Sequence, residues 1–154
     1  MNKKHPAYKY AMDVAEGKVN APKYVKLQVK EFLTIANCKD SRYMIDDNKV
    51  HTIGELLKLM VMPKGLKANS TVYDAMAGFQ WLFIIAILCT VDRDNKDKRR
   101  YENAILEICR KNGKTFLIAV LFILLFFIEP KFSKFYSVAP DGSLSREIKT
   151  AIEE

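Results

Sequence analysis

The chain has 154 residues, a formal net charge of +7 and a hydrophobic content of 49 %. This size and composition exclude a disordered or fibrous chain and suit a single domain with a real core. The three cysteines are widely separated and there are only two histidines, so neither a disulfide framework nor a zinc or histidine metal cluster is predicted. The basic charge suits a nucleotide, a nucleic acid or an anionic membrane surface, and equally an ordinary solvated surface.

The first quarter of the sequence predicts two helices. We expect the first within residues 1–17, with Pro6 at its start and Gly17 beyond its end, because proline favours the first helical position and glycine the position after the last. Asn20 is a candidate N-cap for the second helix. Apolar residues of the second helix follow helical spacing: Val25, Val29, Phe32, Leu33 and Ala36. The lysines of that helix fall elsewhere and either face DNA phosphates or, as is more usual, form a solvated face: Lys23, Lys26 and Lys30.

Two further helices are expected between residues 46 and 88. Residues 38–47 are polar and turn-like, and Asp46 or Asp47 is a candidate cap for a third helix, which Pro63-Lys64-Gly65 ends. The apolar positions of this third helix are Val50, Ile53, Leu57 and Met60. A fourth helix is expected from Tyr73 or Ala77 to Leu88. It is apolar almost all round, so it should be buried.

A charged connection at residues 93–100 either contacts nucleic acid or, as is more usual, forms a solvated hairpin or loop. After it, a strand, a tight loop and a helix are predicted in succession. Ala104, Leu106 and Ile108 alternate with polar or smaller neighbours, as a largely buried strand requires. Residues 109–115 then form a polar loop that ends in G-K-T, and residues 116–128 are continuously apolar. A Walker A phosphate loop needs this context, because the strand delivers a loop and a helix N-terminus to the same anion.

The residues of the loop carry the matching chemistry. Gly113 lets the backbone approach phosphates closely, Lys114 would reach the β- and γ-phosphates, and the Thr115 hydroxyl would bind Mg²⁺. The standard pattern is G-x-x-x-x-G-K-S/T, and it puts Ile108 where the first glycine belongs, so the strict motif is not met. A basic loop that caps an ordinary buried helix is the alternative. The segment Ile87–Asp92 imitates a Walker B strand, but it precedes the loop and is discounted.

The chain continues past the apolar helix with a second expected strand. Glu129-Pro130 stops the helix, Phe132–Val138 reads as a strand parallel to the first, and a last helix begins near Ser143. No apolar strand ending in Asp-Glu follows, so Walker B and the catalytic glutamate are expected to lie outside these residues. The 13 apolar residues of 116–128 span roughly 20 Å as a helix, against about 30 Å of bilayer hydrocarbon, so no membrane span is expected.

Two segments resemble the ATPase part of a tailed-phage or prophage terminase large subunit. They are R-K-N-G-K-T, which follows a strand ending in Glu-Ile-Cys, and F-Y-S-V-A-P-D-G-S-L-S-R-E. That family uses a deviant Walker A loop without the first glycine, so Ile108 is no departure from its pattern. Cys109 stands where the family commonly has glycine or alanine. The resemblance covers most of the chain and is specific from about Phe79 to Glu147.

The resemblance implies an ATP and Mg²⁺ site with assigned roles. Lys114 and the loop amides hold the phosphates, and Thr115 holds Mg²⁺. Either Arg110 or a residue of a neighbouring subunit neutralises charge developing at the γ-phosphate. The remaining phosphate-side residues are Lys111, Asn112, Gly113 and Phe116. On the base side, Gln80 would pair with adenine, with Phe79 or Trp81 near the ring; a buried helix with one satisfied amide is the alternative. Asp141 and Arg146 could act near the turn after the second strand, or Asp141 could simply cap the last helix.

We therefore expect an α/β fold: a mainly helical portion at 1–92, then a Walker A βαβ unit at 93–154 that supplies the first strands of a truncated P-loop NTPase parallel sheet. By resemblance the function is the ATP-binding part of a viral DNA-packaging motor. Its partners are double-stranded DNA, the portal and the small terminase subunit, in a possible ring, in the host bacterial cytoplasm. The rivals are a non-enzymatic interaction module from a truncated or split terminase, and a membrane-surface protein. We expect these 154 residues alone to hydrolyse ATP negligibly.

Overall fold

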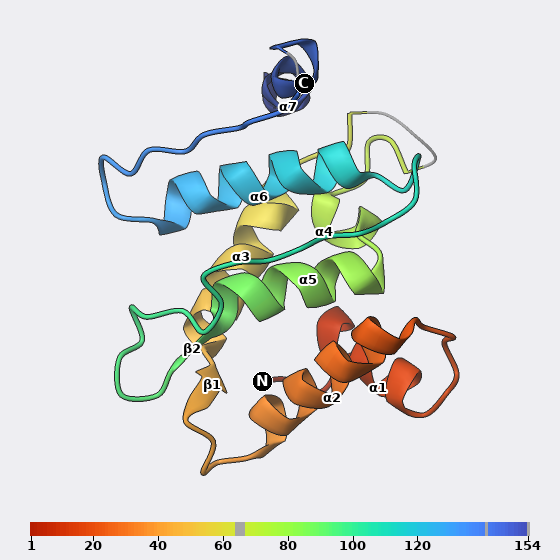
Figure 1. Ribbon diagram of the computed structural model, residues 1–154, viewed down its shortest axis with the longest axis vertical. Helices are drawn as coiled ribbons and strands as arrows, with labels where there is room; N and C mark the ends of the chain where they lie inside the picture. The colour runs from red at the N-terminus through yellow and green to blue at the C-terminus, as the bar shows by residue number, and fades with distance from the viewer. Residues whose placement is uncertain (64–66, 141, 154) are drawn as a thin grey trace. The chain divides into compact units, whose positions relative to one another are not determined.

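The computed structural model describes residues 1–63, 67–140 and 142–153 (Figure 1). The chain forms two compact units, Met1–Ala104 and Ile105–Glu154. Among the described residues, the first unit contains five helices and a small sheet, and the second contains two helices. The protein therefore mixes helix with a little sheet, as expected, and the second unit begins after residue 104.

The first two helices form where the sequence predicts them. α1 (Pro6–Ala15) has proline in its first turn, and the Nδ1 atom of His5 accepts the Ala7 N–H at 3.2 Å as the N-cap. Gly17 follows the helix with φ +75°, a left-handed conformation that glycine adopts without strain. α2 (Lys23–Asn37) begins after Pro22 with no side-chain cap, so the predicted role of Asn20 as the cap is wrong.

The third helix is capped by Asp46, as one of the two candidates predicted. The Asp46 carboxylate accepts the Asn48 N–H at 2.9 Å, and α3 (Asp47–Leu59) follows. The helix ends at Leu59, and residues 64 and 65 of the predicted stop signal lie outside the described residues. A short helix that was not predicted, α4 (Val72–Ala75), is capped by the Thr71 hydroxyl.

The core of the first unit is built around α5 (Gly78–Cys89), the predicted all-apolar helix. α5 packs on α1 and α3, and Trp81 is 1 % exposed between the rings of His5 and Tyr73. Close packing on α1 depends on Gly78, because a Cβ there would lie 2.7 Å from Tyr10 Cβ. Full burial therefore explains the absence of a polar face on this helix.

A two-stranded antiparallel sheet was not predicted. β1 (Tyr43–Ile45) pairs with β2 (Thr90–Asp92), with Met44 opposite Val91. Each strand has only three residues, too few for an alternating pattern to stand out from a turn or a helix end. Because β2 pairs antiparallel with β1, its Asp92 does not have the parallel-sheet setting of a Walker B aspartate.

The second unit contains α6 (Lys114–Ile128) and α7 (Gly142–Glu153), which pack on each other. Both helices and the stop at Glu129 agree with the sequence analysis. Neither predicted strand of the βαβ unit forms: residues 104–108 and 132–138 have no β-ladder. A strand needs a hydrogen-bonded neighbour, and among the described residues no other strand lies beside either segment. None of the helices in the described ranges is long and apolar enough to cross a membrane.

Candidate functional site

The predicted phosphate loop is a tight bend directly before α6. Lys111 and Gly113 have φ values of 65° and 71°, both in the left-handed region. Between them, Asn112 folds back, and its Nδ2 atom donates to the carbonyl oxygens of Cys109 at 3.3 Å and Arg110 at 3.4 Å. Local backbone geometry and one amide side chain thus shape the loop, and no β-strand holds it in the described residues.

The first turn of α6 presents backbone donors. Gly113 is the N-cap and has no side chain to accept them, and the first helical bond runs from Leu117 N–H to the Gly113 carbonyl at 2.9 Å. The amides of Lys114, Thr115 and Phe116 therefore have no partner within the helix. Together with the helix dipole, these free donors make the start of α6 a favourable place for an anion.

The side chains around this helix start add positive charge. Arg110, Lys111 and Lys114 are all exposed. The nearest acidic residues in the sequence are Glu107 and Glu129, before the loop and after the helix. A polyanion such as a triphosphate would therefore meet three cations and a set of free amides within one short segment.

A magnesium ion fits this segment only as a companion of the phosphates. No group of three or more histidine, cysteine or carboxylate side chains capable of holding a metal occurs in the described ranges. Thr115 is half-buried in the first turn of α6 and offers one hydroxyl oxygen. Because Mg²⁺ keeps several waters and binds readily through phosphate oxygens, one hydroxyl is compatible with a metal that arrives with the nucleotide.

Gln80, the predicted adenine contact, lies in the other unit and has a structural task there. Its side chain is 8 % exposed, and its Oε1 atom accepts the Ala77 N–H at 2.9 Å, at the start of α5. A buried, hydrogen-bonded glutamine is the arrangement given above as the alternative to base recognition. Phe79 is half-buried. Trp81 is buried in the core, so its ring is not available to a base.

The predicted site residues are divided between the two units. Gln80 belongs to the unit Met1–Ala104 and Lys114 to the unit Ile105–Glu154, and each is described within its own unit. Arg146 is exposed on α7. Asp141, the candidate for a role near ATP or for a helix cap, lies outside the described residues.

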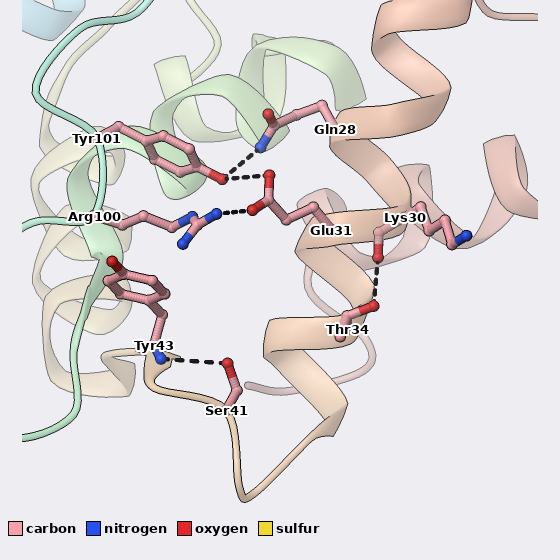
Figure 2. Close-up of polar contacts among 8 residues, drawn as sticks. All are labelled: Gln28, Lys30, Glu31, Thr34, Ser41, Tyr43, Arg100 and Tyr101. Atoms are coloured by element: carbon pink, nitrogen blue, oxygen red, sulfur yellow. Dashed lines mark hydrogen bonds and ion pairs between the residues drawn. The ribbon is translucent and has the colours of Figure 1, made fainter.

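A polar cluster that the sequence analysis missed fixes the segment that leads toward the loop. Figure 2 shows Arg100 ion-paired with Glu31 of α2, and the Tyr101 hydroxyl donating to the same carboxylate at 3.2 Å. Gln28 donates to the Tyr101 oxygen at 3.1 Å, and the Arg100 guanidinium carbon lies 4.2 Å from the Tyr43 ring centroid. The partners are about 70 residues apart in sequence, and no local pattern indicates such a pairing.

Comparison with known protein families, curated proteins and solved structures found no match.

Proposed function

We propose that this chain is the N-terminal, ATP-binding part of the ATPase domain of a tailed-phage terminase large subunit. The observation that carries the proposal is the R-K-N-G-K-T loop, which ends in a left-handed glycine and opens directly into α6. Its support is threefold: free first-turn amides, three exposed cations, and the resemblance of this segment to the deviant Walker A loop of that family.

In this proposal the loop residues share the work of holding a triphosphate. The amides from Lys111 to Phe116, Asn112 among them, surround the phosphate oxygens, and the Lys114 ammonium reaches the β- and γ-phosphates. Thr115 binds Mg²⁺ beside them. Arg110 neutralises charge that develops when water attacks the γ-phosphorus and the bond to the β-phosphate oxygen breaks, giving ADP and phosphate.

Base recognition falls to Gln80, with Phe79 beside the ring. The Gln80 carbonyl already accepts one hydrogen bond, but a carbonyl oxygen has two lone pairs. It can therefore accept the adenine N6 amino group as well, while its NH₂ group donates to N7. This assigns Gln80 both a structural and a recognition role.

The parallel P-loop sheet is part of the same proposal. Residues 104–108 and 132–138 would become neighbouring strands once other strands of a sheet pair with them. Three apolar side chains of these segments are almost fully exposed, Ile105 at 93 %, Phe132 at 97 % and Val138 at 91 %. Exposed apolar residues in segments with alternating patterns are what unpaired strands of a buried sheet would present.

The biological setting follows from the family resemblance. The partners would be double-stranded DNA, the portal and the small terminase subunit, with subunits arranged in a possible ring in the host bacterial cytoplasm. The motor would hydrolyse ATP to drive DNA into a capsid.

A nucleotide series tests the proposal. Because the loop holds the β- and γ-phosphates, Mg-ATP and Mg-ADP should bind, and AMP and adenosine should bind far more weakly. Equal affinity for all four, or no binding of any, would remove the phosphate-loop interpretation.

Turnover by these residues alone should be negligible, since no carboxylate among the residues that the structure describes takes the place of Walker B or of the water-orienting glutamate. General-base help alone is worth about 10²- to 10⁴-fold in rate. Phosphate release from Mg-ATP, with and without DNA, should equal that of Lys114→Ala. Turnover well above that blank would require a catalytic carboxylate within the chain, with Asp141 and the Asp46–Asp47 pair the first candidates.

The second candidate is a non-enzymatic interaction module from a truncated or split terminase. The exposed apolar side chains of Ile105, Phe132 and Val138 favour it, because a protein partner that supplies strands would cover them. Partner binding that persists in Lys114→Ala, without nucleotide binding by the parent chain, would support this candidate over the first.

A further inference from the structure

A cleft lies between the end of α1, the loop that follows it and the middle of α2. Its volume is about 760 Å³, and its apolar lining includes Val14, Val19, Val29 and Leu33. Val14 and Val29 are buried, so they form the floor, whereas Val19 and Leu33 are half-buried at the sides. The cleft belongs entirely to the first unit and is separate from the phosphate loop.

Two lysines give this cleft a positive rim. Lys26 and Lys30 line it, are exposed, and lie one helical turn apart on α2. No aspartate or glutamate contributes to its lining. Among the residues that the structure describes, neither ammonium group pairs with a carboxylate. Glu31, the neighbour in sequence, is paired with Arg100, and Figure 2 shows Lys30 extending away from it.

We propose that this cleft binds an acidic amphipathic segment of a partner protein. Apolar side chains of the segment would fill the space above Val14 and Val29, and its carboxylates would pair with Lys26 and Lys30. The volume lies within the roughly 300–1,000 Å³ of ordinary ligand pockets, enough for a few side chains. A helix laid in a groove with charges along one edge is a recurring mode of peptide recognition.

A nucleic-acid backbone fits the cleft less well. Phosphates would use the lysines but would leave the apolar floor between α1 and α2 without an occupant. The combination of an apolar floor and a positive rim is complementary to a peptide that has both apolar and acidic side chains.

The probe for this proposal is a short labelled helical peptide with leucine at every third or fourth position and glutamate elsewhere. Its partner probe has glutamine in place of every glutamate, and a labelled DNA duplex serves as the competing class. Fluorescence anisotropy at low and high salt should show binding of the acidic peptide that weakens with salt, and much weaker binding of the glutamine peptide. DNA binding that depends on the same lysines, without binding of the acidic peptide, would overturn the proposal.

Two substitutions locate the binding. Lys26→Glu with Lys30→Glu should weaken the acidic peptide at least about tenfold, because attraction becomes repulsion at both positions. Thr34→Trp keeps the charge but fills the cleft from its exposed edge, and it should weaken the peptide similarly. Lys4→Glu with Lys9→Glu is the matched control: the same charge change, at exposed lysines that do not line the cleft.

Equal loss in the control pair would assign the effect to net charge and contradict a site in the cleft. Full binding of the peptide by Thr34→Trp would also contradict a site in the cleft. Thermal melts show whether each variant is folded. If the double charge reversal does not fold, peptide binding by Thr34→Trp tests the proposal instead. ATP binding should be unchanged in all the cleft variants, so this proposal and the proposed function fail separately.

Discussion

Lys111 and Gly113 both have left-handed backbone conformations, at φ 65° and 71°, with Asn112 alone between them. Left-handed geometry costs a residue with a Cβ roughly 1 kcal/mol or more and costs glycine almost nothing. Glycine therefore fits its position at 113, whereas the backbone of Lys111 is strained. Strain of this kind in a short exposed loop is often associated with ligand binding.

Replacing Gly113 by alanine should loosen the start of α6. The new Cβ makes φ 71° unfavourable by about 1 kcal/mol, so amide exchange in the first turn should accelerate several-fold, and nucleotide affinity should fall. Lys111→Gly is the companion variant: it relieves strain at φ 65° and should leave exchange there unchanged or slower. If both variants change exchange in the same direction and to the same degree, backbone strain is not what shapes the loop.

Gln80→Ala should have two effects, on stability and on base choice. Loss of the bond to the Ala77 N–H removes a helix cap, at a cost of about 0.5–2 kcal/mol. If Gln80 also reads adenine, the preference for ATP over GTP should shrink. Competition binding and thermal melts on the same samples measure both quantities.

Gln80→Glu separates those two effects. A carboxylate still accepts the Ala77 N–H and is favourable near the start of α5, but it has no NH₂ group to donate to adenine N7. We expect near-normal stability with a reduced preference for ATP. Unaltered base choice in both variants would leave Gln80 with its capping role alone.

The polar contacts of Glu31 with Arg100 and Tyr101 should couple α2 to the segment that contains these two residues. Glu31→Gln keeps the shape but removes the charge opposite Arg100, whose Nε atom is already buried without a hydrogen bond. We expect a loss of about 1–3 kcal/mol in the free energy of unfolding, and about 1 kcal/mol for Tyr101→Phe. A double-mutant cycle in urea measures the coupling between Glu31 and Tyr101, and a coupling of zero would show that their contact does not contribute to stability.

Most of the helices could be predicted from sequence because their signals are local. Pro6 and Gly17 bracket α1, and Asp46 caps α3, each by chemistry that acts within one turn. Tertiary pairing left no such signal: β1 and β2 are three residues each, and Glu31 meets Arg100 across 69 positions. The strand pattern at 104–108 marks a segment suited to a sheet, but alternation cannot supply the neighbouring strand that a ladder requires.

The features of the candidate site were likewise predictable from sequence where their signal is local. The G-K-T tripeptide predicts the helix start, and α6 begins at Lys114. The sequence indicated the buried, hydrogen-bonded state of Gln80 only as an alternative to base recognition. A glutamine three residues after a cap can hydrogen-bond either to the helix backbone or to a ligand. Trp81 was placed near a base by the resemblance, but His5 and Tyr73 enclose it.

Stability of the first unit should decrease in acid because of His5. Burial lowers the pKa of His5 from 6.5 to about 4, and its neutral Nδ1 atom caps α1. Between these pH values the unfolded chain binds a proton that the folded chain does not, so stability falls as pH decreases from 6.5 toward 4. The expected loss is about 1–2 kcal/mol after allowance for partial solvent exposure.

His5→Asn tests this assignment, because asparagine retains a capping oxygen and does not titrate. Urea denaturation above pH 6.5 and near pH 4 should show a smaller acid loss in the variant than in the parent chain. Equal acid losses in the two proteins would assign the pH dependence to other groups.

We expect the loop before α6 to bind the phosphates of ATP, and Lys114→Ala tests this binding most directly. Lys114 is exposed at the first position of the helix, so its removal deletes a charge without disturbing the core. Lys131→Ala, at another exposed lysine of the same unit outside the loop, is the control. Equilibrium titration with a fluorescent Mg-ATP analogue should show binding by the parent and by Lys131→Ala, and a loss of about 100-fold or more in Lys114→Ala with an unchanged circular dichroism spectrum. Parent-like binding by Lys114→Ala, or its unfolding, would contradict the account.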